Sequence, residues 1–219
     1  MKVQTTVDNL SKQGLGIIKH LGKTYFALGV WPGEEAIFTL NPTPTKEKVL
    51  TAICEEIIVA SPHRISSPCP HLGFLPGTCQ GCPWSFIEYP EQLRMKKNKL
   101  LYALQRFGPK ENYGTAEIIE EVIPSPDIWG SRSRAQLKTD GQNIGYVSMK
   151  ATGSTILAPI ADCPALNSPT RDLLHQLMLQ LPNRNWLPGP GHSWNYFEID
   201  DLMKLEDLKL NRRRGFHQS

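Results

Sequence analysis

Four cysteines constrain this chain more than any other feature of its sequence. Three lie close together, at Cys69, Cys79 and Cys82, and Cys163 follows far downstream. Thiolates are strong ligands for soft or borderline metals, and a tetrahedral site takes four ligands. Gly81 allows a tight backbone turn between two of the cysteines, and the surrounding prolines and glycines are typical of a loop. The spacing therefore predicts an iron–sulfur cluster or a zinc ion.

Composition indicates a soluble globular protein. With 219 residues, of which 40% are hydrophobic and 21% charged, the chain can bury a core in one or two domains. Its net charge of +3 permits a nucleic-acid partner without requiring one. The first residues form no apolar signal segment, and no apolar run is long enough to span a membrane. We therefore expect a cytoplasmic protein with no membrane partner, in which clustered cysteines indicate a metal.

Residues 1–60 have the pattern of a small β-barrel. Short strands separated by glycine-containing turns are predicted at 3–7, 14–18, 24–28, 35–40 and 49–59. Such barrels often bind single-stranded RNA through aromatic and basic side chains. Lys19, His20 and Lys23 lie near a turn and are candidate RNA contacts; simple solvation of the loop is the alternative.

The cysteine loop leads into a basic helix predicted over 88–107. Its apolar stripe consists of Leu93, Leu100, Leu101, Leu104 and Phe107, and its cations either contact phosphate or form a solvated face. His71 is the one histidine placed to substitute as a metal ligand. Cys54 matches no ligand spacing, and we expect it to be a buried structural residue.

The last third of the chain predicts further strands and one helix. Residues 131–138 alternate, which places Arg132, Arg134 and Lys138 on one face of an exposed strand. These cations are candidate RNA contacts, and ion pairs with Glu117 or Glu120 are the alternative.

Two more strands, at 144–149 and 156–160, are expected after a turn at Asp140-Gly141. A helix is expected over 168–181, with Ser168 as its N-cap.

The glycines of the first segment resemble those of a TRAM domain, an RNA-binding barrel appended to RNA-modifying enzymes. The resemblance rests on Asn-Leu-Ser-Lys-Gln-Gly-Leu-Gly at 9–16, Gly-Lys at 22–23 and Gly-Val-Trp-Pro-Gly-Glu at 29–34. Each of these glycines lies where a strand has to turn or bulge.

Residues 79–97 resemble the cluster loop and following helix of the rRNA uracil-5-methyltransferases that carry a 4Fe-4S centre. In that family a Cys-Gly-Gly-Cys pair precedes an aromatic residue and a Tyr-x-x-Gln-Leu segment, and here Gln80 replaces the first of those glycines. The order Arg-x-Arg-x-x-x-Lys, Ile-Gly-Tyr, Cys-Pro-x-Leu in 132–166 resembles the family's central domain. The resemblance implies a 4Fe-4S cluster on the four cysteines, although Cys69 lies further upstream than the family spacing.

The resemblance covers essentially the whole chain but only the front half of the family. The family's C-terminal domain binds S-adenosylmethionine and supplies the nucleophilic cysteine and the general base. No cysteine follows Cys163, so no catalytic residue is expected in this chain. Its last residues resemble the start of the family's Phe-x-Gln-x-Asn motif, which makes Gln218 a candidate cofactor-binding residue.

The expected fold is mainly β with α (α+β). It consists of an OB-like TRAM barrel at 1–60, a cysteine loop and basic helix at 61–112, and an α/β central domain at 113–219. A missing or separate methyltransferase domain would follow.

The sequence thus predicts the RNA-binding and 4Fe-4S portion of an S-adenosylmethionine-dependent RNA uracil-5-methyltransferase, inactive by itself. Its partner would be structured RNA, rRNA in preference to tRNA, and the cluster would have a structural role. Two alternatives remain. One is a zinc-binding RNA module that uses the same four cysteines. The other is a small iron–sulfur electron carrier, which would need neither the barrel nor the basic strand.

Overall fold

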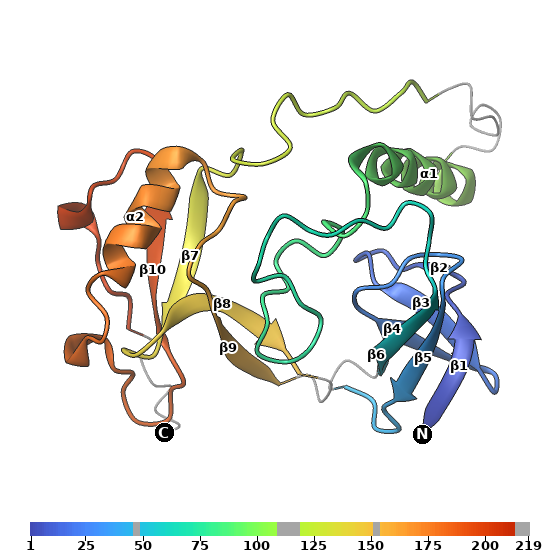
Figure 1. The fold of residues 1–219 in the computed structure, drawn as a ribbon, viewed down its shortest axis with the longest axis horizontal. Helices are drawn as coiled ribbons and strands as arrows, with labels where there is room; N and C mark the ends of the chain where they lie inside the picture. Colours follow the sequence, from blue (N-terminus) through green and yellow to red (C-terminus); the bar gives the residue numbers. More distant parts are fainter. Residues whose placement is uncertain (46–48, 109–118, 151–153, 213–219) are drawn as a thin grey trace.

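The structure of this chain is a computed structural model that describes residues 1–45, 49–108, 119–150 and 154–212. Two β-sheets dominate it, and the cysteine loop lies between them (Figure 1). The prediction of a mainly β protein with some α-helix is confirmed at the level of fold class. Within the described ranges, no helix is long and apolar enough to cross a membrane.

The first sheet is a curled half-barrel of six strands in the order β1-β5-β6-β4-β3-β2. Its strands are β1 (Lys2–Thr6), β2 (Asn9–Leu10), β3 (Gly16–His20), β4 (Lys23–Ala27), β5 (Glu35–Leu40) and β6 (Leu50–Val59). β4 and β6 are parallel, and the other pairs are antiparallel. Alternate side chains such as Ile18, Ala36 and Phe38 point into one core. All five strands predicted for this segment are present.

The hairpin between β3 and β4 turns through two residues, Leu21 and Gly22. Both have positive φ, 47° and 73°, and the flanking residues His20 and Lys23 pair with each other. This is the geometry of a type I′ turn, in which glycine or asparagine is preferred at both positions. The Leu21 side chain is 82% exposed, so burial does not offset its backbone strain.

Helix α1 (Tyr89–Phe107) follows the cysteine loop and is packed mainly through its first half. Its buried residues are Glu91 and Met95. Met95 joins a small core with Leu10, Trp31, Phe86 and Ile87, which fastens the helix to the first sheet. The predicted apolar stripe is only partly covered, since Phe107 is 78% exposed.

The second sheet has the strand order β10-β7-β8-β9 and is antiparallel throughout. Its strands are β7 (Arg134–Thr139), β8 (Ile144–Met149), β9 (Thr155–Pro159) and β10 (Asn195–Asp200). Helix α2 (Ser168–Met178) covers one face of the sheet (Figure 1). Leu174 and Leu177 of that helix share a core with Leu137, Phe197 and Ile199 of the strands.

Three details of this half differ from the prediction. The side chain of Asn167, one residue before Ser168, caps α2 by accepting a hydrogen bond from the Thr170 N–H at 3.2 Å. The helix ends at Met178, and the chain then continues in turns. Strand β10 and two short 3-10 helices, at Arg184–Trp186 and Leu205–Asp207, were not predicted.

Candidate functional site

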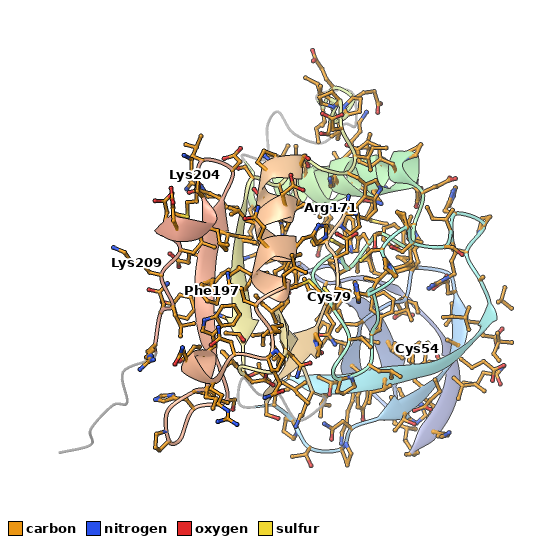
Figure 2. All side chains as sticks on the ribbon, turned by 60° about the vertical axis from the view of Figure 1, so that its left-hand side comes forward. Cys54, Cys79, Arg171, Phe197, Lys204 and Lys209 are labelled. Carbon is orange, nitrogen blue, oxygen red and sulfur yellow. The ribbon has the colours of Figure 1, made fainter. Side chains whose placement is uncertain are left out.

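The four predicted cysteines line one cavity between the two sheets. The cavity has a volume of about 650 Å³ and is bordered by Cys69, Cys79 and Cys82 of the loop and by Cys163 after β9. Cys79 and Cys163 are buried, and the other two are half-buried. In Figure 2, Cys79 lies between the sheets. The fold therefore brings the distal cysteine to the loop.

Backbone hydrogen bonds within the loop set the positions of its cysteines. The N–H of Cys79 donates to the carbonyl of His71 at 3.0 Å, and the N–H of Gly73 donates to the carbonyl of Cys79, also at 3.0 Å. A side chain at Gly73 would meet Thr78 at about 2.5 Å, so glycine permits this close return of the chain. The loop between Cys69 and Cys79 is therefore a compact folded segment.

The segment that carries Cys163 is fastened to helix α2. Asp162 accepts hydrogen bonds from Arg171 Nε at 2.6 Å and from His175 Nε2 at 3.1 Å. The hydrogen bonds from Arg171 hold the pKa of Asp162 down to about 2. Its carboxylate is therefore ionised at neutral pH and can anchor the residue next to Cys163.

Burial and the guanidinium of Arg132 act in opposite directions on two of the four thiols. Burial raises the pKa of Cys79 and of Cys82; the neighbouring thiols add to the rise and the Arg132 guanidinium opposes it. The Tyr146 hydroxyl donates to Cys163 Sγ at 3.6 Å, and burial raises the pKa of that tyrosine. A metal that takes these thiolates would therefore displace protons from Cys79 and Cys82 on binding.

The spread of the four thiols bears on which metal group would fit. In the described part of the chain, no three His, Cys, Asp or Glu side chains have the arrangement that one ion requires. A tetrahedral zinc ion, with Zn–S near 2.3 Å, holds its sulfurs about 3.8 Å apart. In a 4Fe-4S cluster each thiolate binds a different iron, so the sulfurs lie further apart. The described side chains thus do not have the arrangement of a single-ion site.

One ring nitrogen of His71 is already used in a hydrogen bond to the protein backbone. Its Nε2 atom accepts a hydrogen bond from the backbone N–H of Ala161 at 3.0 Å. A lone pair used in this bond is not free to ligate a metal. The structure thus gives His71 a contact with the backbone beside Cys163, and its role as a substitute ligand stays a prediction.

The barrel cations predicted to contact RNA lie around the β3–β4 hairpin. Lys23 is exposed and His20 is half-buried. Lys19 Nζ lies 2.9 Å from a carboxylate oxygen of Asp8 across an exposed surface. Exposed ion pairs contribute little energy, so this pair would not prevent Lys19 from meeting a phosphate.

The strand cations do not form the uniformly exposed stripe that the alternation predicts. Arg134 opens β7 and is exposed, whereas Lys138 is only 8% exposed. Lys138 Nζ donates to Gln136 Oε1 and lies 4.5 Å from the centre of the Tyr196 ring. The prediction of exposure is therefore wrong at Lys138. This side chain also lines the cysteine cavity.

Arg132 lies just before β7, pairs with Leu166 in a backbone bridge and also lines the cavity. Neither Arg132 nor Arg134 forms an ion pair with a described acidic residue. Glu117, one of the proposed partners, lies outside the described residues, as does Gln218.

Sequence reasoning assigned no role to Tyr146 or Gln80, although both lie in segments that it singled out. Tyr146 contacts Cys163, and Gln80 binds the end of β8. The alternation of 144–149 places Tyr146 on one strand face, but which face meets the cysteines depends on how the two sheets are arranged.

Cys54 lies on the opposite wall of the cavity, in β6, where Figure 2 shows it on the first sheet. We expected a buried structural residue; Cys54 is half-buried and packs against the core of the first sheet. Burial raises the pKa of this thiol to about 11. A thiol with this pKa is largely protonated at neutral pH and is a poor nucleophile.

Comparisons with known proteins agree with the resemblance at the level of RNA methyltransferases. No family model matches the chain. It is 39% identical over its full length to an uncharacterized RNA methyltransferase of Nitrosomonas europaea, of which it covers 55%. It is 30% identical, over 87% of its length, to the 23S rRNA (uracil(1939)-C(5))-methyltransferase RlmD of Photorhabdus laumondii, of which it covers 41%. The chain thus spans about half the length of these relatives.

A solved structure shares the fold. The tRNA (uracil-54, C5)-methyltransferase of Pyrococcus abyssi, solved in complex with S-adenosyl-L-homocysteine, matches 98% of this chain with a TM-score of 0.60. The match covers 47% of that protein at 18% sequence identity, so it concerns the fold alone. Both sequence relatives are named RNA methyltransferases, and the one from Photorhabdus laumondii is named for the C5 position of a uracil in 23S rRNA.

Proposed function

We propose that this chain is the RNA-holding, 4Fe-4S-bearing part of an S-adenosylmethionine-dependent RNA uracil-C5-methyltransferase. One observation carries the proposal: four cysteines from two distant segments line a single cavity. The relatives named as RNA methyltransferases support the reaction class. The fact that the chain spans about half of their length supports a division of labour between this part and the rest of the enzyme.

In this proposal, Cys69, Cys79, Cys82 and Cys163 hold the cluster. A cluster bound there would join the loop to the segment before α2 and so link the two sheets at one point. Metal groups of this kind stabilise folds by cross-linking segments that contribute little core of their own. The apolar walls of the cavity would shield the sulfurs from water. The Tyr146 hydroxyl would donate a hydrogen bond to one of them, Cys163 Sγ.

RNA would be gripped by two basic surfaces. One is the β3–β4 hairpin, which carries Lys19, His20 and Lys23. This hairpin belongs to the first sheet, and we propose that residues 1–60, which contain the sheet, are a TRAM domain. The other is the start of the central domain, with Arg132 and Arg134, while Lys138 lies deeper in the cavity. These cations would neutralise phosphates and fix the register of a structured RNA, for which rRNA is the first candidate because one relative bears that name.

The chemistry itself would belong to the part of the enzyme beyond this chain. There, a cysteine would add to the uracil ring, S-adenosylmethionine would supply the methyl group, and a base would remove the C5 proton. The residues of this chain would hold the RNA while that happens. Gln218 would match the glutamine of the family motif with which that domain begins.

The first test is anaerobic purification with a visible spectrum and analysis of iron, sulfide and zinc. We expect broad absorbance near 400 nm and about four irons and four sulfides per chain. Cys163→Ser should lose most of the iron, whereas Cys54→Ser should keep it. One zinc per chain and no visible absorbance would indicate that the four cysteines bind zinc and not a 4Fe-4S cluster.

RNA binding is tested through its salt dependence. For single-stranded contacts, the slope of log K against log salt changes by about 0.7 per phosphate neutralised. Arg132→Gln with Arg134→Gln should therefore reduce the slope by about one to one and a half. Lys204→Gln with Lys209→Gln removes the same number of charges and is the matched control, because both exposed lysines lie at the outer side of the second sheet in Figure 2. An unchanged slope in the double variant would remove these arginines from the RNA surface.

A further inference from the structure

Strand β8 has a partly uncovered edge beside the cysteine loop. It pairs with β9 along its length but with β7 only at Ile144 and Gly145. Hydrogen bonds to β9 alternate along an antiparallel strand, and the N–H of Lys150 donates to the carbonyl of Ser154 at 2.8 Å. The backbone groups of the preceding residue, Met149, therefore point away from β9. Met149 is 56% exposed, so its backbone groups can bond either to water or to another protein group.

The side chain of Gln80 supplies that partner. The N–H of Met149 donates to Gln80 Oε1 at 3.0 Å, and Gln80 Nε2 donates to the carbonyl of Met149 at 3.4 Å. The side-chain amide thus binds the strand edge as a peptide group of a neighbouring strand would. Nearby, the N–H of Gly77 donates to Ser148 Oγ at 3.2 Å, so the loop contacts β8 at two successive residues.

A second contact joins the same loop to the segment after β9 that carries Cys163. His71 Nε2 accepts from the N–H of Ala161 at 3.0 Å, two residues before Cys163. Gln80 lies between Cys79 and Cys82, and His71 lies two residues after Cys69. Both contacts are therefore made by residues close in sequence to proposed metal ligands.

We infer that Gln80 and His71 are positioning residues that hold the cysteine loop on the second sheet without a metal, so that the four thiols are gathered before it binds. This inference rests on the proposed metal site. Gln80, His71 and Gly77 bind the loop to the sheet and to the segment after β9 by hydrogen bonds of the protein itself. A preorganised site binds its ligand with less loss of conformational entropy. A glycine at position 80, as in the resembling family, has no side chain to bind Met149.

Amide hydrogen exchange of the full chain tests the contacts directly, before and after iron is removed with a chelator. We expect the amides of Met149 and Ala161 to stay protected in both states. Gln80→Ala should speed exchange at Met149 by about fivefold or more, the effect of losing one ordinary hydrogen bond. Gln80→Glu keeps the accepting oxygen and should restore part of the protection. Gln142→Ala, at an exposed glutamine of the β7–β8 turn, should change neither amide.

Loss of protection in the metal-free wild-type chain would overturn the inference, because the metal would then be what holds the loop. Unchanged exchange at Met149 in Gln80→Ala would also overturn it.

Iron retention supplies the second readout. We expect Gln80→Ala and His71→Ala to release iron to a chelator several-fold faster than wild type, with all four cysteines intact, and Gln142→Ala to match wild type. Equal release rates in all four proteins would show that the contacts do not support the site. A wild-type chain that holds no iron would instead refute the cluster, while the exchange measurement would still decide whether the loop is held.

Discussion

The indole Nε1 of Trp31 donates a hydrogen bond to Glu91 Oε1 across 3.1 Å, which joins the first sheet to the first turn of helix α1. Both side chains are buried, and Glu91 also accepts from Arg94. The hydrogen bond from Arg94 is the main cause that lowers the pKa of Glu91 below its ordinary value of 4.5. A buried carboxylate therefore links the packing of α1 to pH.

We predict that Glu91→Ala lowers the free energy of unfolding by roughly 1–3 kcal/mol, the cost of leaving a buried donor without a partner. Because the folded pKa is depressed, the stabilising effect is present above about pH 4.5 and is lost as pH falls through the folded value. Urea unfolding at pH 7 and at pH 3 measures both effects. Glu91→Gln should show a weaker pH dependence than wild type, and Glu206→Gln, at an exposed site, should behave as wild type.

The hydroxyl of Tyr146 should influence the reduction potential of the proposed cluster. Hydrogen bonds to cluster sulfurs raise the reduction potential, because they stabilise the more negative, reduced state. Tyr146→Phe removes the donor to Cys163 Sγ and should shift the potential to a more negative value. A redox titration followed by visible absorbance measures the shift. Tyr102→Phe, which removes an exposed hydroxyl on α1, is the control. An unshifted potential would exclude a hydrogen bond to the cluster.

Much of the fold could be predicted because its local signals agree with its packing. β5 and β8 have the predicted bounds, Glu35–Leu40 and Ile144–Met149, since alternation and turn glycines indicate the same limits. The four cysteines could be grouped from chemistry alone, because a metal site requires several ligands. What spacing could not supply was the arrangement of the two sheets around them.

Strand β10 was missed because its buried face begins with a polar residue. Asn195 is 2% exposed, and its amide nitrogen donates to the carbonyls of Trp186 and Leu187. These partners come from a preceding turn that no local pattern indicates. The error had a consequence: β10 places Tyr196 opposite Lys138 and covers a cation that alternation alone had put on an open face.

The thiol of Cys54 should react slowly. Its pKa of about 11, raised by burial, leaves it roughly 100-fold less ionised at pH 8 than a thiol of pKa 9. Because the thiolate is the reactive form, alkylation should be slow at pH 8 and accelerate as pH rises toward 11. Mass spectrometry after timed iodoacetamide treatment measures the rate. Rapid labelling of Cys54 at pH 8 in the folded chain would contradict the assigned environment.

The tip of the β3–β4 hairpin combines a strained backbone with an exposed apolar side chain. Leu21 has φ of 47°, a left-handed conformation that disfavours residues with a bulky Cβ substituent. Asparagine tolerates this conformation far better, so Leu21→Asn should raise the free energy of unfolding by up to about 1 kcal/mol. Thermal or urea unfolding measures the change, and Leu202→Asn, at a leucine that is 89% exposed, is the control.

We expect the same variant to weaken RNA binding. Leu21 stands between His20 and Lys23, so an RNA strand that meets those cations also meets the leucine, which can pack against an unpaired base. Leu21→Asn would then be more stable than wild type and yet bind RNA less tightly, with an unchanged salt slope because no charge is lost. Binding at wild-type affinity, together with higher stability, would mean that the hairpin tip does not touch RNA. A loss of both stability and affinity would instead indicate damage to the hairpin itself.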